Sequence, residues 1–189
     1  MKKTTIALIL TLLASSFLAS CSKYTVDKPE LTPEKTQQYE QAIEENQEKL
    51  KAAELTDVEK TEALQSIGVS YERLGQYDDA IDYYEQILEI APTNFVALNN
   101  LAAIYEEVEE FDLAQKYVEI LYQYYGKDTG TNQGITTDVI RILVKNKEFD
   151  KAKKILEDYA RDFQSEETGA FISDQFEFIG RVEAEENKK

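Results

Sequence analysis

Carboxylates are the commonest side chains in this sequence that could carry out chemistry. Adjacent acidic pairs occur at residues 78–79, 106–107 and 166–167. A hydrolase built on two carboxylates needs a pocket that removes them from water, so that one carboxyl keeps its proton while the other stays ionised. The surrounding residues predict helix ends and turns, where carboxylates are solvated and, at a helix start, interact favourably with the helix dipole. We therefore expect surface charges and a protein that is not an enzyme.

The residue inventory removes several other kinds of site. The 189 residues include no histidine and only one cysteine, which excludes histidine-dependent triads, zinc sites built from His and Cys, and intrachain disulfides. The seven glycines stand singly and form no glycine-rich phosphate-binding loop. With 37 acidic against 21 basic residues, the net charge of -16 disfavours binding to nucleic acid or anionic lipid. We expect no cofactor, no metal and no nucleic-acid partner.

The single cysteine, Cys21, follows a segment typical of exported proteins. Two lysines come after Met1, and an apolar run over residues 4–18 has the organisation of a signal peptide. The run closes on Leu-Ala-Ser-Cys at 18–21, which resembles the lipobox of bacterial lipoproteins. The resemblance implies removal of residues 1–20 and acylation of Cys21. The alternative is an ordinary secretory signal with an incidental cysteine.

The lipobox resemblance also implies a location. Ser22 stands where an aspartate would retain many lipoproteins in the inner membrane, so the outer membrane is favoured in a cell that has two. Residues 21–33 hold two of the three prolines and no amphipathic period, which predicts an extended linker of roughly 40 Å. We expect a membrane-anchored lipoprotein that faces the periplasm or the cell exterior.

From residue 34 onward the composition is that of helices, rich in Glu, Lys, Gln, Ala and Leu. Thr32 as N-cap with Pro33 after it predicts a helix start, and we expect this helix to run over about 34–54. Thr56 and Glu59 have the spacing of a capping box, which predicts the start of the next helix. The sequence thus predicts an all-α domain over residues 34–186.

The dominant pattern is a repeat of 34 residues, over 61–94, 95–128 and, after a short insertion, a degenerate copy at 133–166. The equivalent positions are Leu64, Ile67, Gly68, Tyr71, Tyr77, Ala80, Tyr84 and Ile87 in the first copy, Leu98, Leu101, Ala102, Tyr105, Phe111, Ala114, Val118 and Leu121 in the second, and Thr136, Val139, Ile140, Leu143, Phe149, Ala152, Leu156 and Tyr159 in the third. This pattern closely resembles the tetratricopeptide repeat.

The resemblance implies a solenoid of antiparallel helix pairs in which small residues let the helices approach closely. Ala80 and Ala114 occupy such contacts, whereas Glu85 is expected to face solvent. Ile140 replaces the small residue in the third copy, so we expect its helices to pack differently. Each copy buries its apolar face only against neighbours, and a helix over about 168–185 is the expected C-terminal cap.

The resemblance further implies protein binding. Similar small repeat lipoproteins act as pilotins for secretins, in outer-membrane assembly, and as adaptors for peptidoglycan enzymes, so we expect a partner protein of the cell envelope. The alternative is a small-molecule or glycan-binding lipoprotein, which would need an enclosed pocket. The sequence does not choose among the envelope processes.

In such repeats the concave face is lined by fixed positions of each first helix. The candidate partner-binding residues at these positions are Glu72, Arg73, Asn99, Asn100, Arg141 and Lys145. The paired asparagines could hold an extended segment by its backbone amides, because their side chains both donate and accept. Arg141 and Lys145 would favour an acidic group at the far end. The alternatives are a merely solvated face and a contact surface made by Tyr117, Tyr122, Tyr124 and Tyr125.

Overall fold

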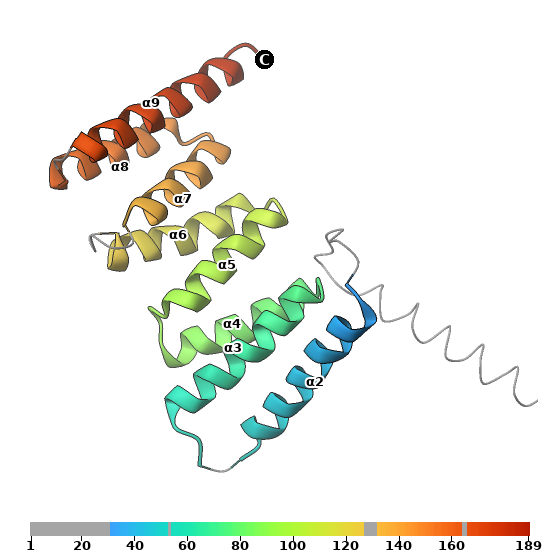
Figure 1. Ribbon diagram of the computed structural model, residues 1–189. Coiled ribbons are helices and arrows are strands. Elements are labelled where there is room, and N and C mark those ends of the chain that lie inside the picture. Colours follow the sequence, from blue (N-terminus) through green and yellow to red (C-terminus); the bar gives the residue numbers. More distant parts are fainter. Residues whose placement is uncertain (1–30, 53, 127–131, 164–165) are drawn as a thin grey trace, which may run out of the picture.

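Eight helices and no strand make up the part of the chain that the computed structural model describes, which is residues 31–52, 54–126, 132–163 and 166–189. In order, the helices are α2 (Pro33–Leu50), α3 (Asp57–Arg73), α4 (Tyr77–Ile90), α5 (Phe95–Glu107), α6 (Phe111–Tyr125), α7 (Asn132–Lys145), α8 (Phe149–Asp162) and α9 (Glu166–Glu186). They stack in chain order from α2 at one end to α9 at the other (Figure 1). The predicted signal segment and Cys21 lie outside the described residues.

The first two helices begin where the sequence predicts. Thr32 is the N-cap of α2 and Pro33 its first residue, but the helix ends at Leu50 rather than at 54. A tight turn accounts for the early end, because the backbone N–H of Lys51 donates to the carbonyl of Glu48 at 3.1 Å. The capping box at the start of α3 is confirmed in both directions between Thr56 and Glu59.

Every helix pair turns through a left-handed residue at the same repeat position. Gly75 has φ +75° between α3 and α4, and Glu109 and Lys147 have φ 60° and 62° in the two later turns. The same backbone hydrogen bond closes each turn, from the N–H of the following residue to the carbonyl five residues before it, at 2.8–2.9 Å. The degenerate third copy therefore has the same turn geometry as the first two.

One apolar core runs through the three pairs and into α9. The small residues at the repeat contacts are all buried, namely Gly68, Ala80, Ala102, Ala114 and Ala152. In the third copy, the position equivalent to Gly68 and Ala102 is occupied by Ile140, which is fully buried. Its larger side chain fills space that the small residues do not fill in the first two copies. Close helix contact thus depends on residue size at one position of each copy.

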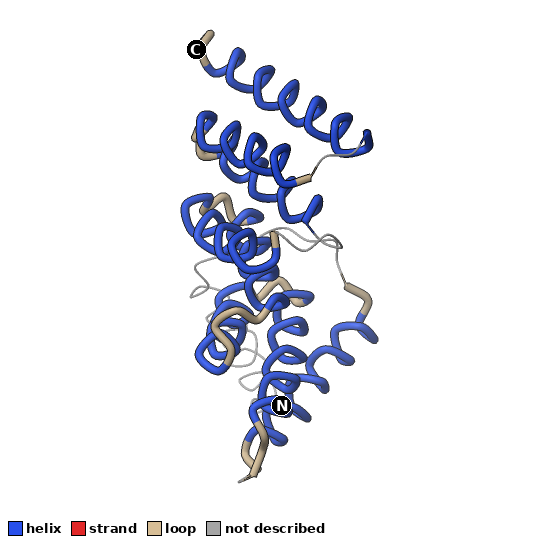
Figure 2. The backbone as a smooth tube through the Cα atoms, turned by 90° about the vertical axis from the view of Figure 1, so that its left-hand side faces the viewer, coloured by secondary structure: helices blue, strands red, loops and turns tan. Residues whose placement is uncertain are grey.

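The two flanking helices close the ends of this core. Ile43 of α2 is buried, and Leu50 packs against the core from the same helix. At the other end α9 lies along α8 and is anchored by the fully buried Ile179. Figure 2, turned by 90°, shows the helices in a tall, narrow stack. No described helix is both long enough and apolar enough to span a membrane.

Candidate protein-binding face

The candidate residues come from the first helix of each pair. Glu72 and Arg73 lie at the end of α3, the asparagine pair lies on α5, and Arg141 and Lys145 lie on α7. Because the helices follow one another in a regular stack, equivalent positions of successive copies come close together. The structure sorts the six residues into one internal network, one ion-pair cluster and two exposed side chains.

The internal network is centred on Tyr84, a fully buried residue of α4. Its hydroxyl donates to Oε2 of Glu72 at 3.2 Å. Burial raises the pKa of Tyr84, the Glu72 carboxylate raises it further, and a hydrogen bond with Asn100 opposes the shift. Glu72 and Asn100 are both half-buried. These two residues therefore link α3, α4 and α5 internally and offer only part of their polar surface to a partner.

Asn99 and Arg73 are the exposed members of the set. Neither has a hydrogen bond or ion pair within the described residues. An exposed asparagine amide offers two donors and an accepting carbonyl, which matches the backbone of an extended peptide. Of the predicted asparagine pair, Asn99 is thus the residue free to bind.

Arg141 and Lys145 converge on an internal carboxylate. Nη1 of Arg141 donates to Oε1 of Glu106, and Nζ of Lys145 reaches the same oxygen at 2.8 Å. Nη2 of Arg141 also contacts Oδ1 of Asp138 at 2.6 Å. Glu106 is only 17% exposed at its side chain, so it is not the solvated charge that its acidic neighbourhood predicts. An acidic group of a partner would therefore compete with Glu106 for these partly exposed cations.

Partial burial shifts the pKa values of this cluster. It lowers the pKa of Arg141 and of Lys145, the latter also through repulsion from Arg141, and it raises the pKa of Asp138. Lys145 additionally lies 5.0 Å from the ring centroid of Phe111. The sequence predicted Glu106 as a solvated surface charge and gave no sign of the pairing in its local neighbourhood. The offset of 35 residues between Glu106 and Arg141, close to one repeat length, was the available signal.

The tyrosine cluster on α6 is mostly internal. Tyr117 is buried and stacks on Tyr105 with ring centroids 5.7 Å apart, and Tyr122 packs against the core. Tyr125 meets Phe95 edge-on, and its hydroxyl donates to the carbonyl of Thr93. Only Tyr124 is exposed, at 58%. The four residues therefore do not form one contact surface.

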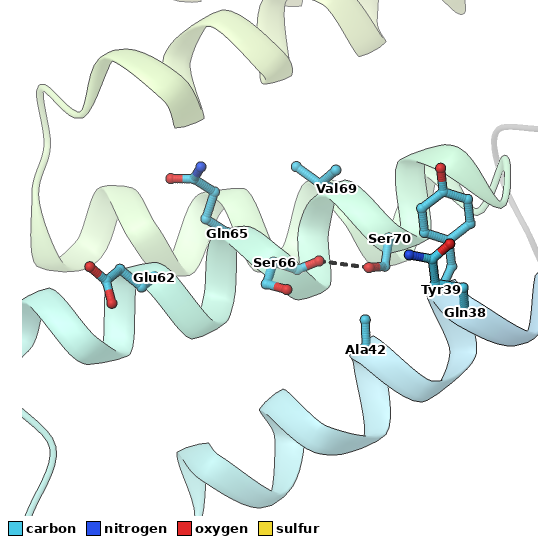
Figure 3. A pocket seen from close by; sticks show the side chains of 8 residues that line it. All are labelled: Gln38, Tyr39, Ala42, Glu62, Gln65, Ser66, Val69 and Ser70. Atoms are coloured by element: carbon cyan, nitrogen blue, oxygen red, sulfur yellow. Dashed lines mark hydrogen bonds between the residues drawn. The ribbon is translucent and has the colours of Figure 1, made fainter. Parts of the chain in front are cut away.

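An open trough lies between α2 and α3, at the α2 end of the stack (Figure 3). Its volume is about 400 Å³, and Tyr39, Ala42 and Val69 supply its apolar walls. Glu62 is its single charged residue. Four of its lining residues, Glu62, Gln65, Ser66 and Val69, occupy concave-face positions in the first helix of the first copy. Within the described residues, no group of three acidic or cysteine side chains is placed to hold a metal ion.

Comparison with family models identifies the repeats. Residues 61–94 match the tetratricopeptide repeat, and a second model of the same repeat matches residues 83–116. The first match coincides with the first predicted copy, whereas the second begins inside α4 and ends inside α6. The chain therefore carries tetratricopeptide repeats, which confirms the resemblance for the first copies.

Similarity to individual proteins and solved structures supports the fold. An uncharacterized protein, ycf37, of Pyropia yezoensis is 49% identical over 49 residues, which are 26% of this chain and 28% of that protein. The solved structure of MamA AMB-1 superposes with a TM-score of 0.53 at 20% identity, over 79% of this chain and 78% of that one. A double mutant of MamA RS-1 gives 0.50 at 13% identity, over 84% and 100%. The likeness confirms an all-α, tetratricopeptide-like solenoid.

Proposed function

We propose that this protein is a lipid-anchored adaptor that binds a segment of another cell-envelope protein along the first helices of its repeats. Tetratricopeptide repeats are interaction scaffolds whose stacked helices present an extended binding surface. The observation that carries the proposal is the exposed amide of Asn99 in the middle of this face, which has no hydrogen bond to any residue that the structure describes. The adaptor itself is not an enzyme, and its partner belongs to a process such as secretin piloting, outer-membrane assembly or peptidoglycan remodelling.

The anchor in this proposal is the acylated thiol of Cys21. Each buried CH₂ contributes about 0.8 kcal/mol, and two chains hold a protein stably in a bilayer. The linker at 21–33 would let the helical domain reach a partner roughly 40 Å from the membrane. The domain would face the periplasm or the cell exterior, on the outer membrane in a cell that has two.

Crosslinking in the native envelope tests the partner-binding face. Wild type, Asn99→Ala and Gln86→Ala are expressed at equal levels, where Gln86 is an exposed control on α4. We expect the crosslinked partner to be lost with Asn99→Ala and retained with Gln86→Ala. Equal capture by both variants would move the contact to another face of the stack.

Detergent partition tests the anchor separately. Wild type should enter the detergent phase, and Cys21→Ala should stay aqueous and escape processing by the lipoprotein signal peptidase. Wild type found wholly in the aqueous phase would contradict the anchor and leave the binding face unaffected.

A further inference from the structure

The trough between α2 and α3 differs at its two ends. Tyr39 and Ala42 of α2 lie at one end with Val69 of α3, and the carboxylate of Glu62 lies at the other (Figure 3). Glu62 is exposed and has no ion pair within the described part of the chain. The trough thus joins an apolar wall to a single uncompensated negative charge.

The two serine hydroxyls that line the trough already have partners. Nδ2 of Asn46 donates to Oγ of Ser66 at 3.1 Å, and Oγ of Ser70 donates to the carbonyl of Ser66 at 2.8 Å. The amides of Gln38 and Gln65, in contrast, have no hydrogen bond in the described residues. Within the described residues, the polar groups left for an occupant are therefore the carboxylate of Glu62, the two glutamine amides and the hydroxyl of Tyr39, and their accepting oxygens suit a cation that donates hydrogen bonds.

We infer that this trough binds a lysine or arginine side chain of the partner segment, with an apolar residue of the same segment against Tyr39 and Val69. The charged head of a basic side chain would pair with Glu62 at one end of the trough, while its aliphatic stem lies along the wall and the apolar residue packs at the other end. The inference rests on the proposed function, because the occupant belongs to the partner that the adaptor binds.

The spacing of the trough sets the spacing of the two partner residues. Glu62 and Val69 are seven residues apart on α3, which is roughly 10 Å along the helix axis. A chain in the polyproline II conformation covers about 9 Å in three residues and places residues i and i+3 on the same side, whereas a β-strand would turn them to opposite faces. The partner segment therefore carries its basic residue three positions from its apolar residue.

The rest of the face supports a basic occupant. Arg141 and Lys145 are held by Glu106 and Asp138, so these cations are neutralised within the fold. The whole chain carries a net charge of -16. Long-range attraction therefore steers a basic segment toward this protein and repels an acidic one.

Three synthetic nonapeptides test the inference on the full chain held in lipid nanodiscs. Each has leucine at position 4, alanine or serine elsewhere, and lysine, norleucine or glutamate at position 7. Binding is measured by interferometry at low salt against empty nanodiscs. We expect the lysine peptide to bind about two- to fivefold more tightly than the norleucine peptide, which is the range for an exposed ion pair. The preference should shrink in 0.5 M salt.

Matched variants test whether the preference for the lysine peptide depends on the carboxylate of Glu62. Glu62→Gln should abolish it, whereas Glu44→Gln, an exposed position on α2 that does not line the trough, should retain it. Equal binding of the lysine and norleucine peptides, tighter binding of the glutamate peptide, or no binding of any peptide up to millimolar concentration would each overturn the inference. A partner captured through Asn99 but indifferent to Glu62→Gln would overturn it while leaving the proposed function standing.

Discussion

The ring of Tyr84 lies directly on Gly68, across the contact between α3 and α4. A Cβ added at Gly68 would stand 2.9 Å from Cε1 of Tyr84 and 3.2 Å from two further ring atoms. The ring is fully buried, and its hydroxyl is held by Glu72. The first repeat therefore uses glycine because no side chain fits beneath the tyrosine.

We expect Gly68→Ala to destabilise the domain by about 1–3 kcal/mol, the usual cost of overpacking a core. Gly180→Ala is the matched control. Gly180 lies within α9, is exposed, and has nothing within 4 Å of an added Cβ. This control should gain about 0.5–1 kcal/mol from helix propensity. Urea unfolding followed by circular dichroism measures both, and equal effects of the two substitutions would remove the steric explanation.

At the turn positions with positive φ, introducing a glycine should stabilise the fold and removing one should destabilise it. Glu109 has φ 60° at the position that Gly75 occupies with φ 75° in the first copy. A left-handed conformation costs an L-residue about 1–2 kcal/mol, and glycine adopts it freely. We expect Glu109→Gly to raise the free energy of unfolding by about 1 kcal/mol and Gly75→Ala to lower it by a similar amount. A loss of stability in Glu109→Gly would mean that its side chain contributes more than its backbone strain costs.

The ion-pair cluster predicts unequal roles for two adjacent glutamates. Glu106 accepts from both Arg141 and Lys145, whereas Glu107 is exposed. We expect Glu106→Gln to cost about 1–2 kcal/mol, within the range for hydrogen bonds to charged groups, and Glu107→Gln to cost little. The difference should fall as salt increases, because both cations are partly exposed. Thermal unfolding in 0.05 and 0.5 M salt measures it, and a salt-independent difference would point to packing instead.

The fold could be predicted because apolar spacing and residue size determine it. Ala80, Ala114 and Ala152 recur at one repeat position, with offsets of 34 and 38 residues, and all three are buried. The third copy was visible despite its insertion because Leu143 and Leu156 keep the period. Hydrophobic periodicity is thus sufficient for a repeat solenoid, in which every copy contacts only its neighbours.

Side-chain partners were much less predictable. Glu85 is exposed, as its repeat position predicts, but the sequence did not indicate that its Oε1 accepts from the hydroxyl of Tyr117 at 3.2 Å. Charged residues of successive copies, such as Glu106 and Lys145, come into contact only when the copies stack. The trough depends on the angle between α2 and α3, which no repeat motif specifies. Glu85 is accordingly a poor surface control on α4, and the exposed Glu89 is the better one.

The capping box at the start of α3 carries a prediction about acid. Oε2 of Glu59 accepts from the backbone N–H of Thr56 at 2.9 Å and from its hydroxyl at 2.8 Å. These hydrogen bonds, the backbone one first, lower the pKa of Glu59 below its ordinary 4.5. A carboxyl whose pKa is lower in the folded state stabilises that state above its unfolded pKa, and this contribution is lost as pH falls through the folded value.

Stability should therefore decline below about pH 4.5 in part through Glu59. Thr56→Ala removes the N-cap and should cost about 1 kcal/mol at pH 7. Glu59→Gln keeps an acceptor at the third helical position but cannot titrate, so its melting temperature should fall less between pH 6 and pH 3 than that of wild type. Glu54→Gln, exposed and just before the helix, is the control and should follow wild type. Identical acid profiles for Glu59→Gln and Glu54→Gln would show that the cap does not contribute to the loss of stability in acid.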